Sequence, residues 1–186
     1  QSGDSGVLSR MRRRYDADAY RDFMRRAVAR VPGIGLGTDV MVGFPGEDET
    51  AFQNSCEMVS ALPFVNVHVF SFSARPRTSA FHMGGAVPPA EIRRRSEHLR
   101  RLALARQHDM YVAQQGGELQ ILFEGASVDG TWAGYSDNYV RARVSSAEVL
   151  ANRMARVAVH GVEITSDGDR VVAVGEILNA EPAWIG

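Results

Sequence analysis

The stretch Ile34-Gly-Leu-Gly-Thr-Asp-Val-Met-Val-Gly-Phe-Pro-Gly-Glu47 decides the fold class of this chain. Its first nine residues form a mostly apolar run that stops at Gly43, as expected of a strand buried inside a parallel sheet. The next residues, Phe44-Pro-Gly-Glu47, predict a tight turn. Asp48 then stands where a helix N-cap is needed, ahead of apolar residues at helical spacing. Those residues are Phe52, Cys56 and Val59.

A strand, a turn and a helix in this order indicate an α/β fold, and the neighbouring segments repeat the alternation. We expect a helix over 16–31, a second strand over 65–72, a loop over 73–87 and a long helix over 88–115. Such alternation favours a parallel sheet. Because two strands are too few for a closed barrel, we expect further strands upstream and exposed apolar surface along the strand around Val40.

The remainder of the chain has a different pattern. Turn signals at Asp129-Gly130 and Asp167-Gly168 separate strand-like stretches, which we expect at 119–126, 131–144, 153–165 and 170–178. Four or five strands in about 65 residues predict a small antiparallel β-barrel. Residues 1–115 carry 16 Arg against 12 acidic residues, whereas residues 116–186 carry 5 against 10. We therefore place a domain boundary after residue 115.

Composition excludes several classes of function. Cys56 is the only cysteine among the 186 residues, which excludes a disulfide framework and any cluster or zinc site built from this chain's own cysteines. All 21 basic residues are arginine, so neither a P-loop lysine nor a Schiff-base lysine is available. No apolar run approaches the roughly 18 residues of a membrane helix, and no signal peptide is visible. We expect a cytoplasmic protein and, since the chain opens in a loop without Met, a fragment of a longer one.

The turn after the first strand is the first candidate ligand site. In α/β sheets, ligands bind at the carboxyl ends of the strands. Gly43 and Gly46 would let a ligand approach the backbone closely, and Phe44 offers a flat apolar face to an aromatic base. The alternative is a tight turn without a ligand, since isolated glycine turns are weak signals.

Four stretches, in this order along the chain, resemble motifs of the radical-SAM tRNA methylthiotransferases. They are Gln1-Ser-Gly-Asp-Ser5 together with Val7-Leu-Ser-Arg-Met-Arg-Arg-Arg-Tyr15, then Thr38-Asp-Val-Met-Val-Gly-Phe-Pro-Gly-Glu47, then His68-Val-Phe-Ser-Phe-Ser-Ala-Arg-Pro-Arg-Thr-Ser-Ala80, and finally Gly134-Tyr-Ser-Asp-Asn-Tyr139. The last stretch is similar to the branch that modifies threonylcarbamoyladenosine beside the tRNA anticodon. The resemblance implies the C-terminal part of a radical-SAM, partial TIM-like barrel over 1–115. An RNA-binding β-barrel of the TRAM type, which is OB-like, would follow over 116–186.

The resemblance also implies S-adenosylmethionine as cofactor, 4Fe-4S clusters in the full-length enzyme, and a 2-methylthio group added to tRNA. Since the cluster ligands are absent from this chain, we expect it to be inactive alone. No catalytic residue or metal ligand is assigned within it, and the five scattered histidines are not expected to bind metal. By their positions in the motifs, the implied cofactor-binding residues are Gln1, Ser2, Asp39, Gly43, Phe44, Pro45, Gly46, Glu47, Ser73 and Arg75.

Other interpretations remain open for several of these residues. Asp39 is also explained as a carboxylate satisfied by neighbouring backbone or by an arginine. Ser73, Arg75 and the nearby Thr78 are equally explained as a surface loop without function. Arg77 stands where the family usually has Gly, so we expect this turn to be shaped differently. Cys56 is expected to be a buried structural thiol.

The expected barrel has candidate contacts to the anticodon arm of tRNA, although its net charge is negative. We predict a local RNA-binding cluster, because tyrosines stack on unpaired bases and arginines meet phosphates. Its members are Tyr135, Asn138, Tyr139, Arg141 and Arg143. The alternative is that the tyrosines fill the barrel core.

The long helix over 88–115 carries a basic stripe. For this stripe we favour a solvated face paired with Glu91 and Glu97 over a phosphate-contacting surface. The stripe consists of Arg93, Arg94, Arg95, Arg100, Arg101 and Arg106. Two interpretations of function follow from the whole chain: part of a tRNA methylthiotransferase acting on N6-threonylcarbamoyladenosine, or a non-catalytic tRNA-binding fragment or module.

Overall fold

The computed structural model describes residues 1–126, 130–168 and 170–180. The chain divides into two compact units, Gln1–Arg106 and Gln107–Gly186. The division falls within helix α4 (Pro89–Val112), earlier than the boundary proposed from charge after residue 115. Each unit is described by itself.

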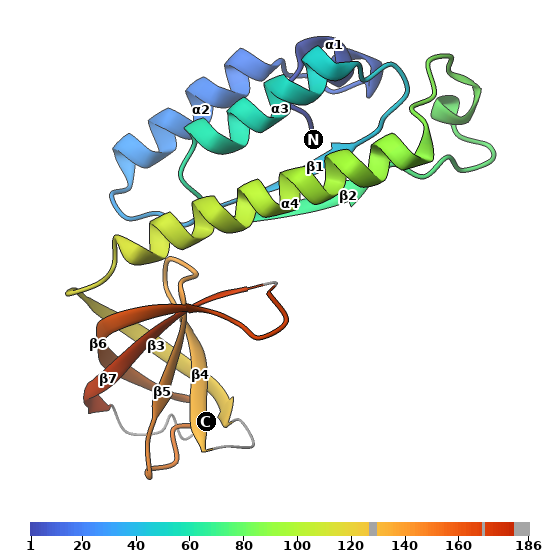
Figure 1. Cartoon of the computed structure of the whole chain (residues 1–186). Coiled ribbons are helices and arrows are strands. Elements are labelled where there is room, and N and C mark those ends of the chain that lie inside the picture. Colours follow the sequence, from blue (N-terminus) through green and yellow to red (C-terminus); the bar gives the residue numbers. More distant parts are fainter. Residues whose placement is uncertain (127–129, 169, 181–186) are drawn as a thin grey trace. The chain divides into compact units, whose positions relative to one another are not determined.

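The first unit contains a two-stranded parallel sheet whose strands are connected by a helix (Figure 1). β1 (Leu36–Val42) pairs with β2 (Phe64–Ser71) in parallel, and α3 (Glu49–Ala61) lies between them in the chain. The predicted alternation of helices and strands is therefore confirmed in this unit. The other elements are α1 (Ser5–Arg10), α2 (Ala17–Arg30) and the short 3-10 helix η1 (Ser79–His82); α1 and η1 were not predicted.

Side-chain caps fix the starts of three helices. The carboxylate of Asp16 accepts a hydrogen bond from the amide of Ala19 at 2.8 Å, and that of Asp48 accepts one from Ala51 at 2.8 Å. Asp4 caps α1 in the same way. Each cap satisfies an amide that the helix cannot pair itself, and a typical cap is worth about 1 kcal/mol. The predicted caps at Asp16 and Asp48 are confirmed.

Helices α2, α3 and α4 pack on one face of the β1–β2 sheet. Val40 and Val42 of β1 are buried there against Phe52 of α3 and Leu99 of α4, and Met24 of α2 packs on the same cluster. Side chains of successive strand residues point to opposite faces of a sheet. The residues of β1 that alternate with Val40 and Val42 therefore lie on the opposite face. All three helices thus leave that second face free.

The second face carries Asp39 and Met41 on β1, opposite His68 and Phe70 on β2. Asp39 and His68 are exposed, and Phe70 keeps 49% of its surface accessible. The apolar exposure expected around Val40 is wrong for Val40 itself, which is fully buried. It is Phe70 that presents apolar surface on this sheet.

The second unit is a closed five-stranded barrel with the strand order β3-β4-β5-β7-β6. A five-stranded Greek-key barrel is the architecture of the OB-fold. Four of the five pairings are antiparallel, as predicted, but β5 and β7 pair in parallel. The strands are β3 (Glu118–Ala126), β4 (Thr131–Ser136), β5 (Arg141–Ser145), β6 (Arg153–Ile164) and β7 (Val171–Ala180).

The predicted strand over 131–144 is in fact two strands, β4 and β5, separated by a turn at 137–140. The turn predicted at Asp167-Gly168 is confirmed, because the amide of Gly168 bonds the carbonyl of Thr165 at 2.7 Å with a positive φ of 73°. The turn predicted at Asp129 lies outside the described residues. Within the described part of the chain, no helix is long and apolar enough to cross a membrane.

Candidate functional site

The turn at the carboxyl end of β1 has a backbone that only its glycines adopt easily. Gly43 and Gly46 have φ values of 84° and 83°, in the left-handed region. A Cβ at Gly43 would collide with Ile92 of α4, and one at Gly46 would collide with the guanidinium of Arg10. Close packing therefore requires the glycine at position 43, whereas the exposed Arg10 side chain could move aside and Gly46 is favoured mainly by its positive φ. This requirement holds whether or not a ligand binds.

A buried ion pair supports the same turn. Oε1 of Glu47 accepts the amide of Gly43 at 3.0 Å and Nη1 of Arg95 at 3.0 Å, and the same Nη1 donates to the Glu47 carbonyl at 3.0 Å. The side chains of Arg95 and Glu47 are only 6% and 1% exposed. Burial raises the pKa of the Glu47 carboxyl, while the Gly43 amide and Arg95 oppose that rise. The pair ties the turn after β1 to α4.

Arg95 is also held from its other sides. Its Nε donates to Glu91 at 2.7 Å and its Nη2 reaches Glu49 at 3.3 Å. The guanidinium lies over the ring of Phe52, 5.3 Å from the centroid. Four of the five N–H donors of this guanidinium are thus engaged within the chain, which leaves at most one for a ligand.

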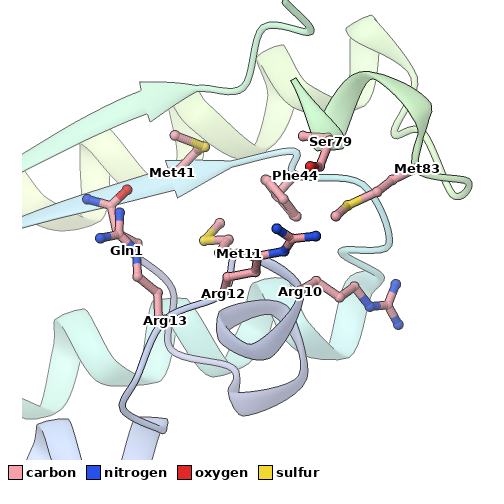
Figure 2. Close-up of a pocket in the computed structure, with 10 residues that line it drawn as sticks. Gln1, Arg10, Met11, Arg12, Arg13, Met41, Phe44, Ser79 and Met83 are labelled. Atoms are coloured by element: carbon pink, nitrogen blue, oxygen red, sulfur yellow. The ribbon is translucent and has the colours of Figure 1, made fainter. Parts of the chain in front are cut away.

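A cavity of about 210 Å³ opens beside the turn (Figure 2). Its apolar lining comes from Phe44 of the turn, Met41 of β1, Met11 after α1 and Met83 after η1. Phe44 is fixed edge-on against Phe72, with ring centroids 5.3 Å apart. The remaining lining residues are Gln1, Arg10, Arg12, Arg13, Ser79 and Ala80.

Of the ten predicted cofactor-binding residues, Gln1 and Phe44 line this cavity. Gln1 is held beside β1, since its carbonyl accepts the amide of Met41 at 2.9 Å. Ser2 is buried and its hydroxyl lies 3.3 Å from that of Ser55, so its observed role is packing within the chain. Gly43, Pro45, Gly46 and Glu47 shape the turn behind Phe44 without lining the cavity.

The other predicted cofactor residues are exposed. Asp39 lies on the uncovered face of β1 and, within the described part, its side chain forms no hydrogen bond or ion pair. The interpretation of Asp39 as a satisfied carboxylate is thus not supported. Ser73 and Arg75 lie in the exposed loop after β2, where the carbonyl of Arg75 accepts the hydroxyl of Thr78 at 2.8 Å. The structure does not bring these residues to the cavity.

Arg77 has a φ of 71°, in the region that glycine favours. A non-glycine residue pays about 1–2 kcal/mol for this conformation. Because Arg77 stands where the family usually has glycine, we expected a differently shaped turn. The turn nevertheless has the positive φ at residue 77 that a glycine would adopt easily.

The basic stripe predicted on α4 is wrong for Arg95, which is buried. Arg94 is paired with Glu49 at 3.0 Å and with Glu91, as the solvated-face interpretation requires, and Arg100 donates to the carbonyl of Val69 at 3.2 Å. The sequence did contain a signal for Arg95. It falls four residues after Glu91 and four before Leu99, on the stripe that faces the core.

On the barrel, Tyr135 of β4 lies opposite Arg141 of β5, with the guanidinium carbon 6.0 Å from the ring centroid. Leu122 of β3 lies beside Tyr135 in register, and both side chains are exposed, at 47% and 39%. The amide of Arg141 is anchored by the hydroxyl of the buried Tyr111 at 2.8 Å. An aromatic ring, an aliphatic neighbour and a cation thus share one exposed face, as stacking on an unpaired base requires.

Tyr139 lies in the turn between β4 and β5, with a φ of 63° and 70% of its surface exposed. The hydroxyl of Ser136 holds this turn by accepting the amide of Val140 at 2.9 Å and by donating to Asn138. The alternative that Tyr135 and Tyr139 fill the barrel core is wrong. That role falls to residues such as Phe123, which is fully buried.

Arg143 is less available than Arg141, because it forms an ion pair with Glu163. Arg153 and Arg156 are likewise paired, with Glu148 at 3.3 Å and Glu118 at 3.2 Å. Most arginines of this acidic barrel are therefore engaged with carboxylates on the same surface.

Cys56 is buried in α3, and burial raises the pKa of its thiol to about 11. A buried, protonated thiol is a poor ligand and a poor nucleophile. Among the described residues, no group of three or more His, Cys, Asp or Glu side chains is arranged to hold a metal ion. The expected structural role of Cys56 agrees with its burial.

Sequence reasoning missed the residues that complete the cavity: Met11, Met41, Met83 and the arginines 10, 12 and 13. Met11 and the arginines lie within the quoted stretch Val7–Tyr15, but no role was assigned to them. Four arginines in the five residues 10–14 were the available signal.

No family model matches the chain. Among curated proteins, it is 32% identical over 170 residues to the threonylcarbamoyladenosine tRNA methylthiotransferase of Thermotoga maritima, covering 89% of this chain and 37% of that protein. It is 31% identical over 166 residues to the Bacillus subtilis protein of the same name, covering 86% and 36%. A tRNA-2-methylthio-N(6)-dimethylallyladenosine synthase of Campylobacter curvus is 28% identical over 179 residues, covering 96% and 40%. The homologues are tRNA methylthiotransferases, and the chain spans about two fifths of their length or less.

Proposed function

We propose that this chain is the C-terminal part of a radical-SAM tRNA methylthiotransferase that adds a 2-methylthio group to N6-threonylcarbamoyladenosine beside the anticodon. The observation that carries the proposal is the match of nearly the whole chain to tRNA methylthiotransferases of two substrate types. The arrangement of both units supports it. One unit offers a cavity at the carboxyl end of a parallel strand, and the other offers an exposed aromatic and basic face on a barrel.

The cavity fits the adenine part of S-adenosylmethionine. Its volume of about 210 Å³ is below the range of about 300–1,000 Å³ for whole drug-sized ligands, so it suits one aromatic ring system. Phe44 and Met41 would contact that ring, and Gln1 would lie at its edge. When bound, S-adenosylmethionine supplies the radical chemistry of the family. Gly43, Gly46 and Glu47 would act indirectly, because they shape the turn that holds Phe44 in place.

The 4Fe-4S clusters do not fit this chain. They require cysteine thiolates, and the only cysteine, Cys56, is buried in α3 with a raised thiol pKa. The ligands would have to come from residues outside these 186. We therefore propose that the chain is catalytically inactive alone.

The barrel is proposed to hold the anticodon arm of tRNA, and the enzyme to act in the cytoplasm, where tRNA is. Tyr135 and Tyr139 would stack on unpaired bases, and Leu122 would add an apolar contact. Arg141, whose side chain forms no ion pair among the described residues, would meet a phosphate from its place over the Tyr135 ring. Asn138 is a weaker candidate, because its side-chain oxygen already accepts the Ser136 hydroxyl. Arg143 would have to leave Glu163.

The choice of threonylcarbamoyladenosine over dimethylallyladenosine rests on the motif Gly134–Tyr139. Relatives of both types match the chain about equally well, so the choice calls for a direct test. tRNA would be isolated from Bacillus subtilis lacking its threonylcarbamoyladenosine tRNA methylthiotransferase, and its nucleosides measured by mass spectrometry. The strain would express either this chain alone or this chain fused after the N-terminal portion of the missing enzyme.

We expect the fusion to restore the 2-methylthio mark on threonylcarbamoyladenosine and the chain alone to leave it absent. Catalysis by the chain alone would contradict the proposed dependence on missing cluster ligands. If the fusion is folded and binds tRNA but restores no mark, the substrate assignment is wrong. The second candidate, a non-catalytic tRNA-binding module, is favoured by the absence of cluster ligands and would then be the better description.

A further inference from the structure

The segment after α1 concentrates positive charge at the cavity. Arg10, Arg12 and Arg13 all line it and all three are exposed (Figure 2). Within the described part of the chain, their side chains form no hydrogen bond or ion pair. Arg12 has a φ of 57°, so the chain bends there through the left-handed region. Three guanidinium groups around one cavity, without carboxylate partners among the described residues, leave a local excess of positive charge that an anion would offset.

Several arginines elsewhere in the chain are paired with carboxylates. Arg94 and Arg95 on α4 are shared among Glu47, Glu49 and Glu91. On the barrel, the arginines 143, 153 and 156 each pair with a glutamate. The cluster of Arg10, Arg12 and Arg13 differs from these paired arginines. It differs from single unpaired arginines such as Arg93 by its density, because three arginines within four residues of the chain line one cavity.

The cavity beside the cluster is apolar, with Phe44 and Met41 on its wall. A positive rim next to an apolar wall suits a ligand that alternates anionic groups with flat apolar ones. A nucleic-acid strand has this alternation, with a phosphodiester at every step beside a base. Several separate guanidinium groups also match successive phosphates better than the single carboxylate of one small molecule.

We propose that Arg10, Arg12 and Arg13 bind the phosphodiester backbone of the substrate RNA at the carboxyl end of β1. This inference rests on the proposed function, since it takes tRNA as the substrate. It assigns to the first unit an RNA contact of its own, in addition to that of the barrel. The three arginines position the strand beside the cavity and take no part in the chemical step.

The test measures binding of the full chain to a fluorescent 17-nucleotide anticodon stem–loop by anisotropy at several salt concentrations. The variant Arg10→Gln/Arg12→Gln/Arg13→Gln is compared with Arg26→Gln/Arg30→Gln/Arg93→Gln. The control removes the same charge from exposed arginines that form no ion pair within the described part. Each phosphate contact to a single strand contributes about 0.7 to the slope of log K against log salt. We therefore expect the first variant to lose about 2 units of slope and about 100-fold in affinity at 0.1 M salt.

The control variant is expected to keep an affinity and a salt slope close to those of the unmodified chain. The variant Arg10→Lys/Arg12→Lys/Arg13→Lys, which keeps the charge, is expected to keep the slope. Equal slopes for the first variant and the control would overturn the inference while leaving the proposed function standing. If the unmodified chain binds no RNA at low salt, the RNA-binding part of the proposed function falls, and this inference with it. Loss of S-adenosylmethionine affinity with an unchanged RNA slope would assign the cluster to the cofactor's carboxylate and also overturn it.

Should the triple variant lose its circular dichroism signal, Arg12→Gln and Arg13→Gln are measured singly. Each is then expected to lose about 0.7 units of slope. An unchanged slope in both single variants would equally refute the contact.

Discussion

Replacing Arg95 by methionine should destabilise the first unit strongly while leaving the barrel intact. The substitution keeps an unbranched apolar stem but removes both donations to Glu47, at 3.0 Å each. The Glu47 carboxylate, whose side chain is 1% exposed, would keep only the Gly43 amide. Removing one partner of a buried ion pair costs about 3–5 kcal/mol, because the other charge stays desolvated. That is a large part of the roughly 5–15 kcal/mol that holds a domain folded.

Two spectroscopic probes separate the units. The described helices, apart from residues 107–112 at the end of α4, lie in the first unit, so far-UV circular dichroism mainly follows that unit in a urea titration. The chain has two tryptophans, of which Trp132 is buried in β4, so tryptophan fluorescence measured in a Trp184→Phe background follows the barrel. At an m-value of about 2 kcal/mol/M, the expected loss moves the circular dichroism midpoint down by about 1.5–2.5 M. The fluorescence midpoint should not move.

Two further variants test the cause. Glu47→Gln/Arg95→Met should cost less than the sum of the two single changes, because no uncompensated charge remains. Arg95→Lys keeps the charge but loses the planar fork, and should fall between the unmodified chain and Arg95→Met. A shift below about 1 kcal/mol for Arg95→Met, or strict additivity with Glu47→Gln, would refute the claim that this pair supports the turn.

Three other predictions concern the barrel and the core. Gly134→Ala should lower the free energy of unfolding by about 1–3 kcal/mol in a fluorescence-monitored urea titration, because the new Cβ would collide with the Leu122 carbonyl. The control Gly161→Ala should be nearly neutral, because its Cβ would meet nothing closer than 3.9 Å. Tyr135→Ala should weaken binding of an anticodon stem–loop by about 1–3 kcal/mol through lost stacking, and Tyr135→Phe should not; equal losses would exclude stacking. With its thiol pKa raised from 9.0 to about 11, Cys56 should resist a thiol reagent at pH 8 until the protein is unfolded. Because the unfolded thiol loses its proton at lower pH than the folded one, stability should fall as pH rises from 9 to 11 relative to Cys56→Ala.

Local signals predicted the first unit well. Asp16 and Asp48 marked the starts of α2 and α3 to the residue, because an N-cap acts on amides only two or three positions away. The six-residue α1 was missed, since it has only Val7 and Leu8 as buried residues and too few turns for a period to show.

Non-local contacts account for the other misses. Arg95 was assigned to a basic stripe because its buried partner, Glu47, is 48 residues away and contributes nothing to the local pattern. The parallel pairing of β5 with β7 depends in the same way on a distant strand. The break between β4 and β5 was missed because Tyr139, not glycine, takes the positive φ of that turn.

Glu47 shows why a position within a motif does not by itself identify a ligand contact. The resemblance placed Glu47 and Phe44 together in the cofactor site, and the two residues are three apart in one turn. What separates them is the capacity that remains for a ligand: Glu47 Oε1 already accepts Gly43 and Arg95 and its side chain is closed to solvent, whereas Phe44 contributes to the cavity wall. A ligand in this cavity would therefore contact Phe44, and Glu47 would affect it only through the shape of the turn. Substitutions at Glu47 should then lower the stability of the first unit, and should alter the contact between Phe44 and a bound aromatic ring only indirectly.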